Sequence, residues 1–220
     1  MSITLFGTCR INNVIGNNNI NNKTNFTQST KEIIQLIKFL TGKKKIETPL
    51  NKLCFRTGLL ENKPIFYSDE LRDTFSKSKL VIVEICSAKN WVYDNHYLHH
   101  MCVDKRYPSC KKNTPQQVLD NYKCIKQTPR EIANDVLEIK ELIFPRKMII
   151  VTHYNAEIDG NLFQQRNQLI SLLNSIAQTH NLNIVNPSNV LKDFMKEEVM
   201  KDDLAHYTDF GIRKMGGIFK

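Results

Sequence analysis

The segment KLVIVEICS, residues 79–87, is the strongest strand signal in the chain. Its apolar run extends from Leu80 to Ile85 without regular alternation of polar residues. Strands of this kind are covered by other elements on both faces, as in parallel sheets that lie between layers of helices. The segment therefore predicts a central strand of an α/β fold.

Similar segments occur on both sides of this one. Further strand candidates are Ile3–Phe6, KMIIVTHYN (147–155), LNIVNPS (182–188) and the shorter LCFRTG (53–58) and PIFY (64–67). Helical patterns lie between them at 29–42, 128–143, 161–181, 188–199 and 208–219. Ser29 with Glu32, and Thr128 with Glu131, have the spacing of a capping box. The alternation predicts one domain over residues 1–220, a three-layer α/β/α fold with a mostly parallel, Rossmann-like sheet.

Composition narrows the class of protein. The chain has 220 residues, of which 41% are hydrophobic and 24% are charged, as in a globular domain. The six cysteines are too dispersed for a disulfide framework and indicate reduced thiols in the cytoplasm. No run approaches the ~20 apolar residues that cross a bilayer, so no membrane association is expected. The abrupt end at Lys220 suggests the N-terminal part of a longer chain.

The net charge of +9 points to an anionic partner. Its lysines are scattered along the chain, and the only compact run is Lys43-Lys44-Lys45, which is typical of a solvated surface. This pattern favours a small phosphorylated ligand, such as a nucleotide-sugar or coenzyme A, over nucleic acid. The chain has neither a P-loop nor a GxGxxG turn, which argues against ATP chemistry and a dinucleotide cofactor.

Residues with nucleophilic or titratable side chains follow the predicted strands. They are Gly7-Thr8-Cys9 after the first strand, Cys86-Ser87 after the second, Thr152-His153-Tyr154-Asn155 after the third, and Asp203 with His206 in DDLAHYTDFG (202–211). Ligands of open α/β sheets bind beyond the carboxyl ends of the strands. A thiol, two imidazoles and a carboxylate brought to one edge form a constellation suited to acyl transfer.

Two of these blocks resemble a known superfamily. FGTC (6–9) and DLAHYT (203–208) resemble the first and last blocks of the SGNH (GDSL-like) hydrolases, in which a Gly-Asp-Ser turn supplies the nucleophile and an Asp-x-x-His loop the base. Cys9 stands in the place of the serine, which makes the chain more similar to the cysteine-bearing GSCFA and WcbI-like proteins. VIVEICSAKNW (81–91) and IIVTHYNAE (149–157) resemble their middle blocks, although the Gly-x-Asn-Asp block is missing.

The block order and composition also resemble the sugar N-acetyltransferase domain of giant-virus glycosylation enzymes. This resemblance implies transfer of an acetyl group from acetyl-CoA to an amino or hydroxyl group of a sugar, in particular a nucleotide-linked 4-amino-sugar of the UDP-viosamine type. The alternatives are an esterase or sugar deacetylase with a Cys9–His206–Asp203 triad, and a non-catalytic module that binds carbohydrate or nucleic acid. A homo-oligomer is compatible with each of these interpretations.

Direct transfer from a thioester to an amine needs a base and oxyanion donors but no covalent intermediate. His153 is the preferred base, because it directly follows a central strand, and His206 oriented by Asp203 is the alternative. Backbone N–H groups near Cys9 and Ser87 are the candidate donors. The candidate substrate-binding residues are Thr8, Arg10, Ser87, Lys89, Trp91, Tyr154 and Asn155.

Residues 88–127 lack clear periodicity and are rich in His, Lys and aromatic residues. We expect this segment to be an inserted lid or substrate-binding loop over the site. Within it, HYLHHMC (96–102) gathers three histidines and a cysteine. A zinc site needs two ligand pairs of regular spacing, so no metal is expected here.

Overall fold

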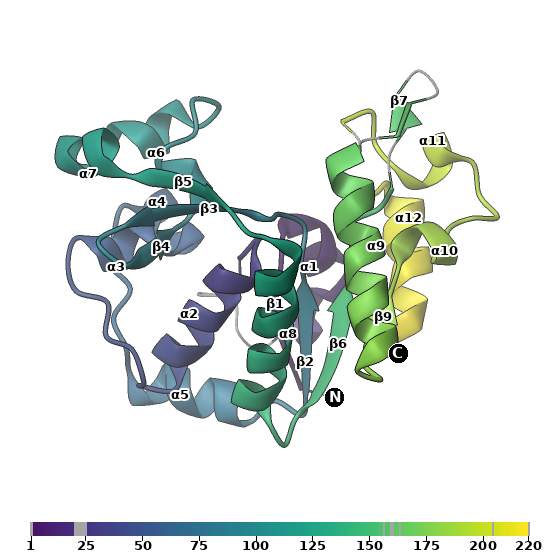
Figure 1. The fold of residues 1–220 in the computed structure, drawn as a ribbon, viewed down its shortest axis with the longest axis horizontal. Helices are drawn as coiled ribbons and strands as arrows, with labels where there is room; N and C mark the ends of the chain where they lie inside the picture. The colour runs from purple at the N-terminus through teal and green to yellow at the C-terminus, as the bar shows by residue number, and fades with distance from the viewer. Residues whose placement is uncertain are drawn as a thin grey trace.

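The computed structural model describes residues 2–19, 26–155, 157–158, 161–162, 164–203 and 205–219 (Figure 1). Its centre is a four-stranded sheet in the order β1 (Ile3–Phe6), β2 (Leu80–Glu84), β6 (Lys147–Val151) and β9 (Asn183–Val185). Every neighbouring pair in this sheet is parallel. The predicted α/β fold with a parallel sheet is thereby confirmed.

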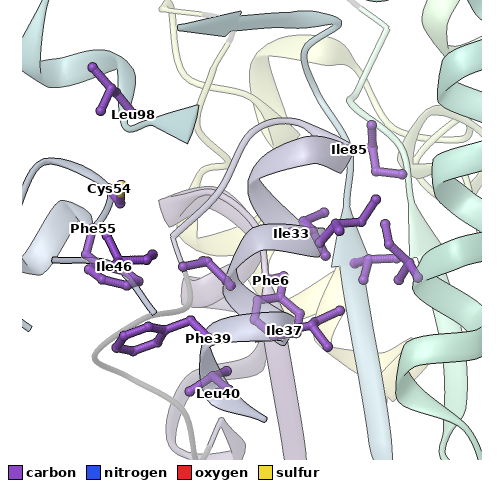
Figure 2. Packing of buried hydrophobic residues seen from close by; sticks show 14 of the residues in the cluster. Phe6, Ile33, Ile37, Phe39, Leu40, Ile46, Cys54, Phe55, Ile85 and Leu98 are labelled. Atoms are coloured by element: carbon purple, nitrogen blue, oxygen red, sulfur yellow. The ribbon is translucent and has the colours of Figure 1, made fainter. Parts of the chain in front are cut away.

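Side chains alternate between the two faces of this sheet, and each face has its own core. Val81 and Val83 of β2 belong to the larger core, together with Phe6 and the helices α2 (Thr30–Leu40), α8 (Pro129–Ile143) and α9 (Gln164–Thr179). Figure 2 shows part of this core, in which Ile33 and Ile37 of α2 lie close to Phe6. Leu80 and Ile82 belong to the smaller core, together with residues of α1 (Cys9–Ile15). The apolar run at 80–85 is thus covered on both faces.

The predicted helix starts are accounted for by their caps. The side chain of Thr128 accepts from the backbone of Glu131, whose carboxylate accepts from the backbone of Thr128. Ser29 accepts from the backbone of Glu32, but the Glu32 carboxylate accepts from the N–H of Gln28 rather than from that of Ser29. The second predicted capping box is therefore displaced by one residue.

The C-terminal part forms a small separate cluster beside the sheet. It contains α10 (Pro187–Val190), α11 (Lys196–Val199) and α12 (Asp209–Gly216), so the helix predicted over 188–199 is two short helices instead. Leu191, Val199, Tyr207 and Met215 are the buried centre of this cluster. α12 packs against α1, and Ala205 and His206, which precede α12, contact Arg10 and Cys9 at the beginning of α1.

Residues 88–127 are not an irregular surface loop. They form an antiparallel sheet of β3 (Lys89–Tyr93), β4 (His96–Leu98) and β5 (Lys123–Lys126), with α6 (Pro108–Lys112) and α7 (Gln116–Asn121). Figure 1 shows this segment at the upper left, beyond the end of α2. Leu98, Met101, Cys102 and Val118 are buried in the larger core, which explains why the segment is ordered despite its weak periodicity.

The two shorter strand predictions were wrong. LCFRTG contributes to α3 (Leu50–Leu53) and α4 (Arg56–Glu61), and PIFY has no regular structure before α5 (Asp69–Ser76). Leu53 and Phe55 are both buried, and two buried residues at this spacing suit either a strand or a helix boundary. A two-stranded ribbon, β7 (Glu157–Ile158) with β8 (Asn161–Leu162), precedes α9. No helix within the described residues is long and apolar enough to cross a membrane.

Candidate active site

Cys9 lies at the carboxyl edge of the sheet, where β1 passes directly into α1. Gly7 allows this turn, because a Cβ atom there would lie 2.7 Å from Ile11 and 2.8 Å from Glu84. Thr8 is the N-cap of α1 and Cys9 is its first residue. The thiols of Cys9 and Cys86 are half-buried, and those of Cys54 and Cys102 are buried. Burial raises the pKa of the Cys54 thiol to about 12 and also raises the pKa of Cys86 and Cys102, which keeps these three thiols protonated.

His206 and Asp203 meet Cys9 from the loop that precedes α12. The Nε2 atom of His206 lies 3.0 Å from the sulfur of Cys9, and Nδ1 lies 2.6 Å from Oδ2 of Asp203. The other oxygen of Asp203 accepts hydrogen bonds from the backbone N–H groups of Ala205 and His206. The structure thus brings Cys9, His206 and Asp203 into the order of nucleophile, base and orienting carboxylate.

The ionisation of Asp203 fixes the tautomer of His206. Partial desolvation would raise the pKa of Asp203, but its hydrogen bonds from His206 and from the backbone of Ala205 and His206 lower this pKa to about 2. An ionised carboxylate only accepts, so Nδ1 of His206 carries a proton, and in the neutral imidazole Nε2 presents its lone pair to Cys9. This tautomer can remove the proton from the thiol.

A buried ion pair lies behind the thiol. The side chains of Arg10 and Glu84 are 2% and 1% exposed, and Nε of Arg10 lies 2.9 Å from Oε1 of Glu84. The other oxygen of Glu84 accepts from the backbone N–H and the hydroxyl of Thr8. Burial alone would lower the pKa of Arg10, but the charge of Glu84 holds it above its ordinary value.

Arg10 also reaches the loop that carries the base. Its Nη1 lies 3.3 Å from the carbonyl oxygen of Ala205, the residue before His206. The ion pair therefore connects the strand β2, the turn at Thr8 and the loop of His206. Arg10 was predicted to bind substrate, but its charge is neutralised inside the protein by the carboxylate of Glu84. Glu84 was not among the predicted site residues.

His153 does not occupy the position of a base. Its Nε2 lies 2.7 Å from Nη1 of Arg10, and its Nδ1 lies 2.9 Å from the carbonyl oxygen of Tyr154. Because Arg10 only donates, Nε2 must accept and Nδ1 must donate, which leaves no lone pair for a substrate. Desolvation, followed by the charges of Arg10 and Arg166, lowers the pKa of His153 to about 2. This geometry does not support the preference for His153, and His206 is the imidazole that contacts Cys9.

A small cavity of about 100 Å³ opens beside Cys9. Its walls combine the nucleophile turn with Gln28, Arg56 and residues of the 88–127 segment, namely His99, His100, Met101 and Tyr107. Both histidines are buried, and desolvation lowers the pKa of His100 to about 4 and that of His99 well below its ordinary value. The segment predicted to cover the site thus contributes neutral imidazoles to it. Within the described residues, no three His, Cys, Asp or Glu side chains form a group that could hold a metal ion.

The remaining predicted binding residues are divided between several places. Ser87 and Lys89 line a second, larger cavity, while Trp91 packs against His100 with ring centroids 5.8 Å apart. The N–H of Ser87 donates to the carbonyl of Gln28 at 3.0 Å, so it is not free to act as an oxyanion donor. Tyr154 packs in the C-terminal cluster, and the N–H of Asn155 donates to Ser188. Trp91, Tyr154 and Asn155 line neither of these two cavities.

Comparisons with known proteins assign the chain to a family. The chain is 24% identical over 234 residues to the Vi polysaccharide biosynthesis protein TviD of Salmonella typhi, an alignment that covers 89% of the chain and 27% of that relative. The chain thus spans about a quarter of the length of this curated protein. No solved structure shows significant similarity to the chain. The model of the TviD N-terminal domain matches residues 1–117 and 109–216, and the chain therefore belongs to the TviD N-terminal domain family.

Proposed function

We propose that this domain is an acyltransferase of glycan biosynthesis, which moves an acetyl group from acetyl-CoA to an amino or hydroxyl group of a sugar. The observation that carries the proposal is the contact of Cys9 with His206 at 3.0 Å and of His206 with Asp203 at 2.6 Å. The name of the relative supports the choice of a glycan pathway, since that protein is one of polysaccharide biosynthesis. A cysteine after the first strand and an Asp-x-x-His loop near the end also support an SGNH-like origin.

The triad favours a covalent route over the direct transfer expected from the sequence. His206 takes the proton of Cys9, and the thiolate attacks the acetyl carbonyl of acetyl-CoA. The bond from the carbonyl carbon to the sulfur of coenzyme A breaks, and the departing thiolate receives the proton from His206. The acetyl group then remains on Cys9 as a thioester.

The second half of the reaction uses the same base. The sugar amine or hydroxyl attacks the thioester and gives its proton to His206, and the sulfur of Cys9 leaves and recovers that proton. Cys9 begins α1, and the N–H groups in the first turn of a helix have no acceptor within the helix. These groups are our candidates for stabilising the oxyanion in both halves.

The size of the cavity beside Cys9 supports a short acyl group. Its volume is about 100 Å³, and Met101 and Tyr107 form part of its wall. The proposed acceptor is a nucleotide-linked amino-sugar, in agreement with the net charge of +9.

The covalent intermediate provides the test. The protein is mixed with acetyl-CoA without an acceptor, quenched with acid, and analysed by peptide mass spectrometry. We expect one acetyl group on Cys9 and release of one equivalent of coenzyme A, both absent in Cys9→Ala. Cys124→Ala is the matched control, because Cys124 is an exposed thiol on β5.

Acceptors are then added to the acetylated protein. Transfer to an amino-sugar nucleotide supports the proposal, whereas loss of the acetyl group to water alone indicates an esterase. Full turnover by Cys9→Ala would contradict the covalent route.

A further inference from the structure

A cavity of about 640 Å³ lies at the same edge of the sheet as Cys9. It is bounded by the end of β2, the paired strands β3 and β5, and the first turns of α8 and α9. Its volume falls within the roughly 300–1,000 Å³ that is usual for small-molecule sites. It is large enough for a ligand several times the size of an acetyl group.

The charged side chains that line this cavity are all positive among the described residues. Lys89, Lys126 and Arg166 line it, and none of the described lining residues is acidic. Lys89 and Lys126 are direct partners in the β3–β5 register, an arrangement in which like charges destabilise a sheet. Neither lysine takes part in an ion pair among the described residues. A bound anion would neutralise this unfavourable pair.

Arg166 provides a third cation from α9. It donates to the carbonyl of Tyr154 at 3.2 Å, which fixes its position on the first turn of α9. Burial and the nearby charge of Arg10 lower its pKa to about 10, so negative charge would be favourable in this environment.

The rest of the lining is suited to a planar organic group. Ala88, Ile132, Leu169 and Leu172 form an apolar side, and glutamines from α9 supply amide donors and acceptors. Cations together with apolar and amide groups in one cavity match the two parts of a nucleotide: phosphates, and a base with its sugar.

The two cavities share a wall. The backbone N–H groups of Cys86 and Ser87, which line the larger cavity, both donate to the carbonyl of Gln28 at 3.0 Å. Gln28 lines the cavity of Cys9. A ligand bound in the larger cavity would therefore lie next to the cavity that contains the thiol of Cys9.

We infer that the larger cavity binds the nucleoside diphosphate portion of a substrate, with Lys89, Lys126 and Arg166 contacting its phosphates. The role of this portion in acetyl transfer rests on the proposed function, but its binding does not. The same chemistry occurs in the adenosine diphosphate part of coenzyme A and in the uridine diphosphate part of a nucleotide-sugar.

Isothermal titration calorimetry separates these sources, with ADP and coenzyme A in one arm and UDP in the other. We expect saturable binding in at least one arm, weakened tenfold or more in Lys89→Gln/Lys126→Gln. The matched control is Lys123→Gln, which removes an exposed charge from the same strand outside the cavity and should bind within twofold of the unmodified chain.

Three results would overturn the inference: no saturable binding in either arm, an unchanged affinity in the double variant, or an equal loss in Lys123→Gln. Cys9→Ala is titrated in parallel and should bind the nucleotide like the unmodified chain. Binding without any acetyl group on Cys9 in the mass-spectrometric test would reject the covalent route of the proposed function and leave this site standing.

Discussion

Nε of Arg10 lies 2.9 Å from Oε1 of Glu84, and both side chains are almost completely removed from solvent. Arg10 directly follows the candidate nucleophile, and Glu84 ends the central strand β2. A charge is costly to bury unless it is paired, so each of these residues requires the other. Their pairing fixes the turn at Thr8 and, through Arg10, the backbone beside His206.

The first prediction is that Glu84→Gln strongly destabilises the fold. The substitution leaves Arg10 buried without a counter-charge, which typically costs about 3–5 kcal/mol. The free energy of unfolding is measured by urea denaturation. Glu138→Gln is the control, because Glu138 forms a partly exposed ion pair with Lys38 and such pairs contribute about 0–1 kcal/mol. Equal effects of the two substitutions would show that the pairing of Arg10 is not needed for stability.

The second prediction separates the two histidines. His206→Gln should slow acetylation of Cys9 by roughly 10²–10⁴-fold, the usual contribution of a positioned general base. His153→Gln should change the rate less than tenfold per folded molecule, because the nitrogens of His153 are bonded to Arg10 and to a backbone carbonyl. The rate is measured in single-turnover experiments with acetyl-CoA. A well-folded His153→Gln variant as slow as His206→Gln would return His153 to the mechanism.

The sequence contained enough information for the sheet but not for the choice of base. The strands at 80–85 and 147–151 were predictable, because such short continuous apolar runs are buried when helices cover both faces of a parallel sheet. Whether His153 or His206 faces Cys9 depends on the direction of each side chain, one after β6 and the other in the loop before α12. Residue spacing does not encode these directions. Both histidines follow apolar or turn segments and look alike in the sequence.

Glu84 could have been found from the sequence. A carboxylate within the apolar run of a covered strand must be buried, and a buried charge requires a partner. Arg10 follows the neighbouring strand and is the cation that parallel pairing brings closest. The order of residues 88–127 could not have been found in this way, because their buried side chains share a core with helices that are distant in the sequence.

The third prediction concerns stability at acid pH. His153 has a pKa of about 2 in the folded protein, against about 6.5 when unfolded. Only the unfolded state gains a proton between these values, so the contribution of His153 to stability is present above pH 6.5 and is lost as the pH falls. The loss is about 1.4 kcal/mol per pH unit, or about 2 kcal/mol between pH 7 and pH 5.

The test compares the unmodified chain with His153→Gln, which has no titrating group at this position. Buried His99 and His100 add to the acid sensitivity of both proteins. Glu32 has the opposite effect on the stability of both proteins. Burial raises the pKa of Glu32 to about 8, so its contribution to stability is lost as the pH rises from about 4.5 towards 8. The contributions of His99, His100 and Glu32 cancel when the free energies of unfolding of the two proteins are subtracted. Denaturation curves with the same pH dependence in the two proteins would contradict the prediction.

The last prediction concerns Asp203, whose two oxygens have different partners. Oδ1 accepts from the backbone of Ala205 and His206, and Oδ2 accepts from Nδ1 of His206. In Asp203→Asn the amide oxygen can retain the backbone contacts, which leaves the amide NH₂ facing Nδ1. Nδ1 must then become an acceptor, the proton moves to Nε2, and His206 presents a donor to Cys9 instead of a lone pair.

Asp203→Asn should therefore fold normally and lose roughly 10²–10⁴-fold in the rate of Cys9 acetylation. Stability should change little, because the side chain of Asp203 is 50% exposed. Asp202→Asn is the matched control, since it removes the adjacent exposed carboxylate and should react like the unmodified chain. A normal rate in Asp203→Asn would mean that the tautomer of His206 is not set by this contact, and that the thiol loses its proton to another acceptor.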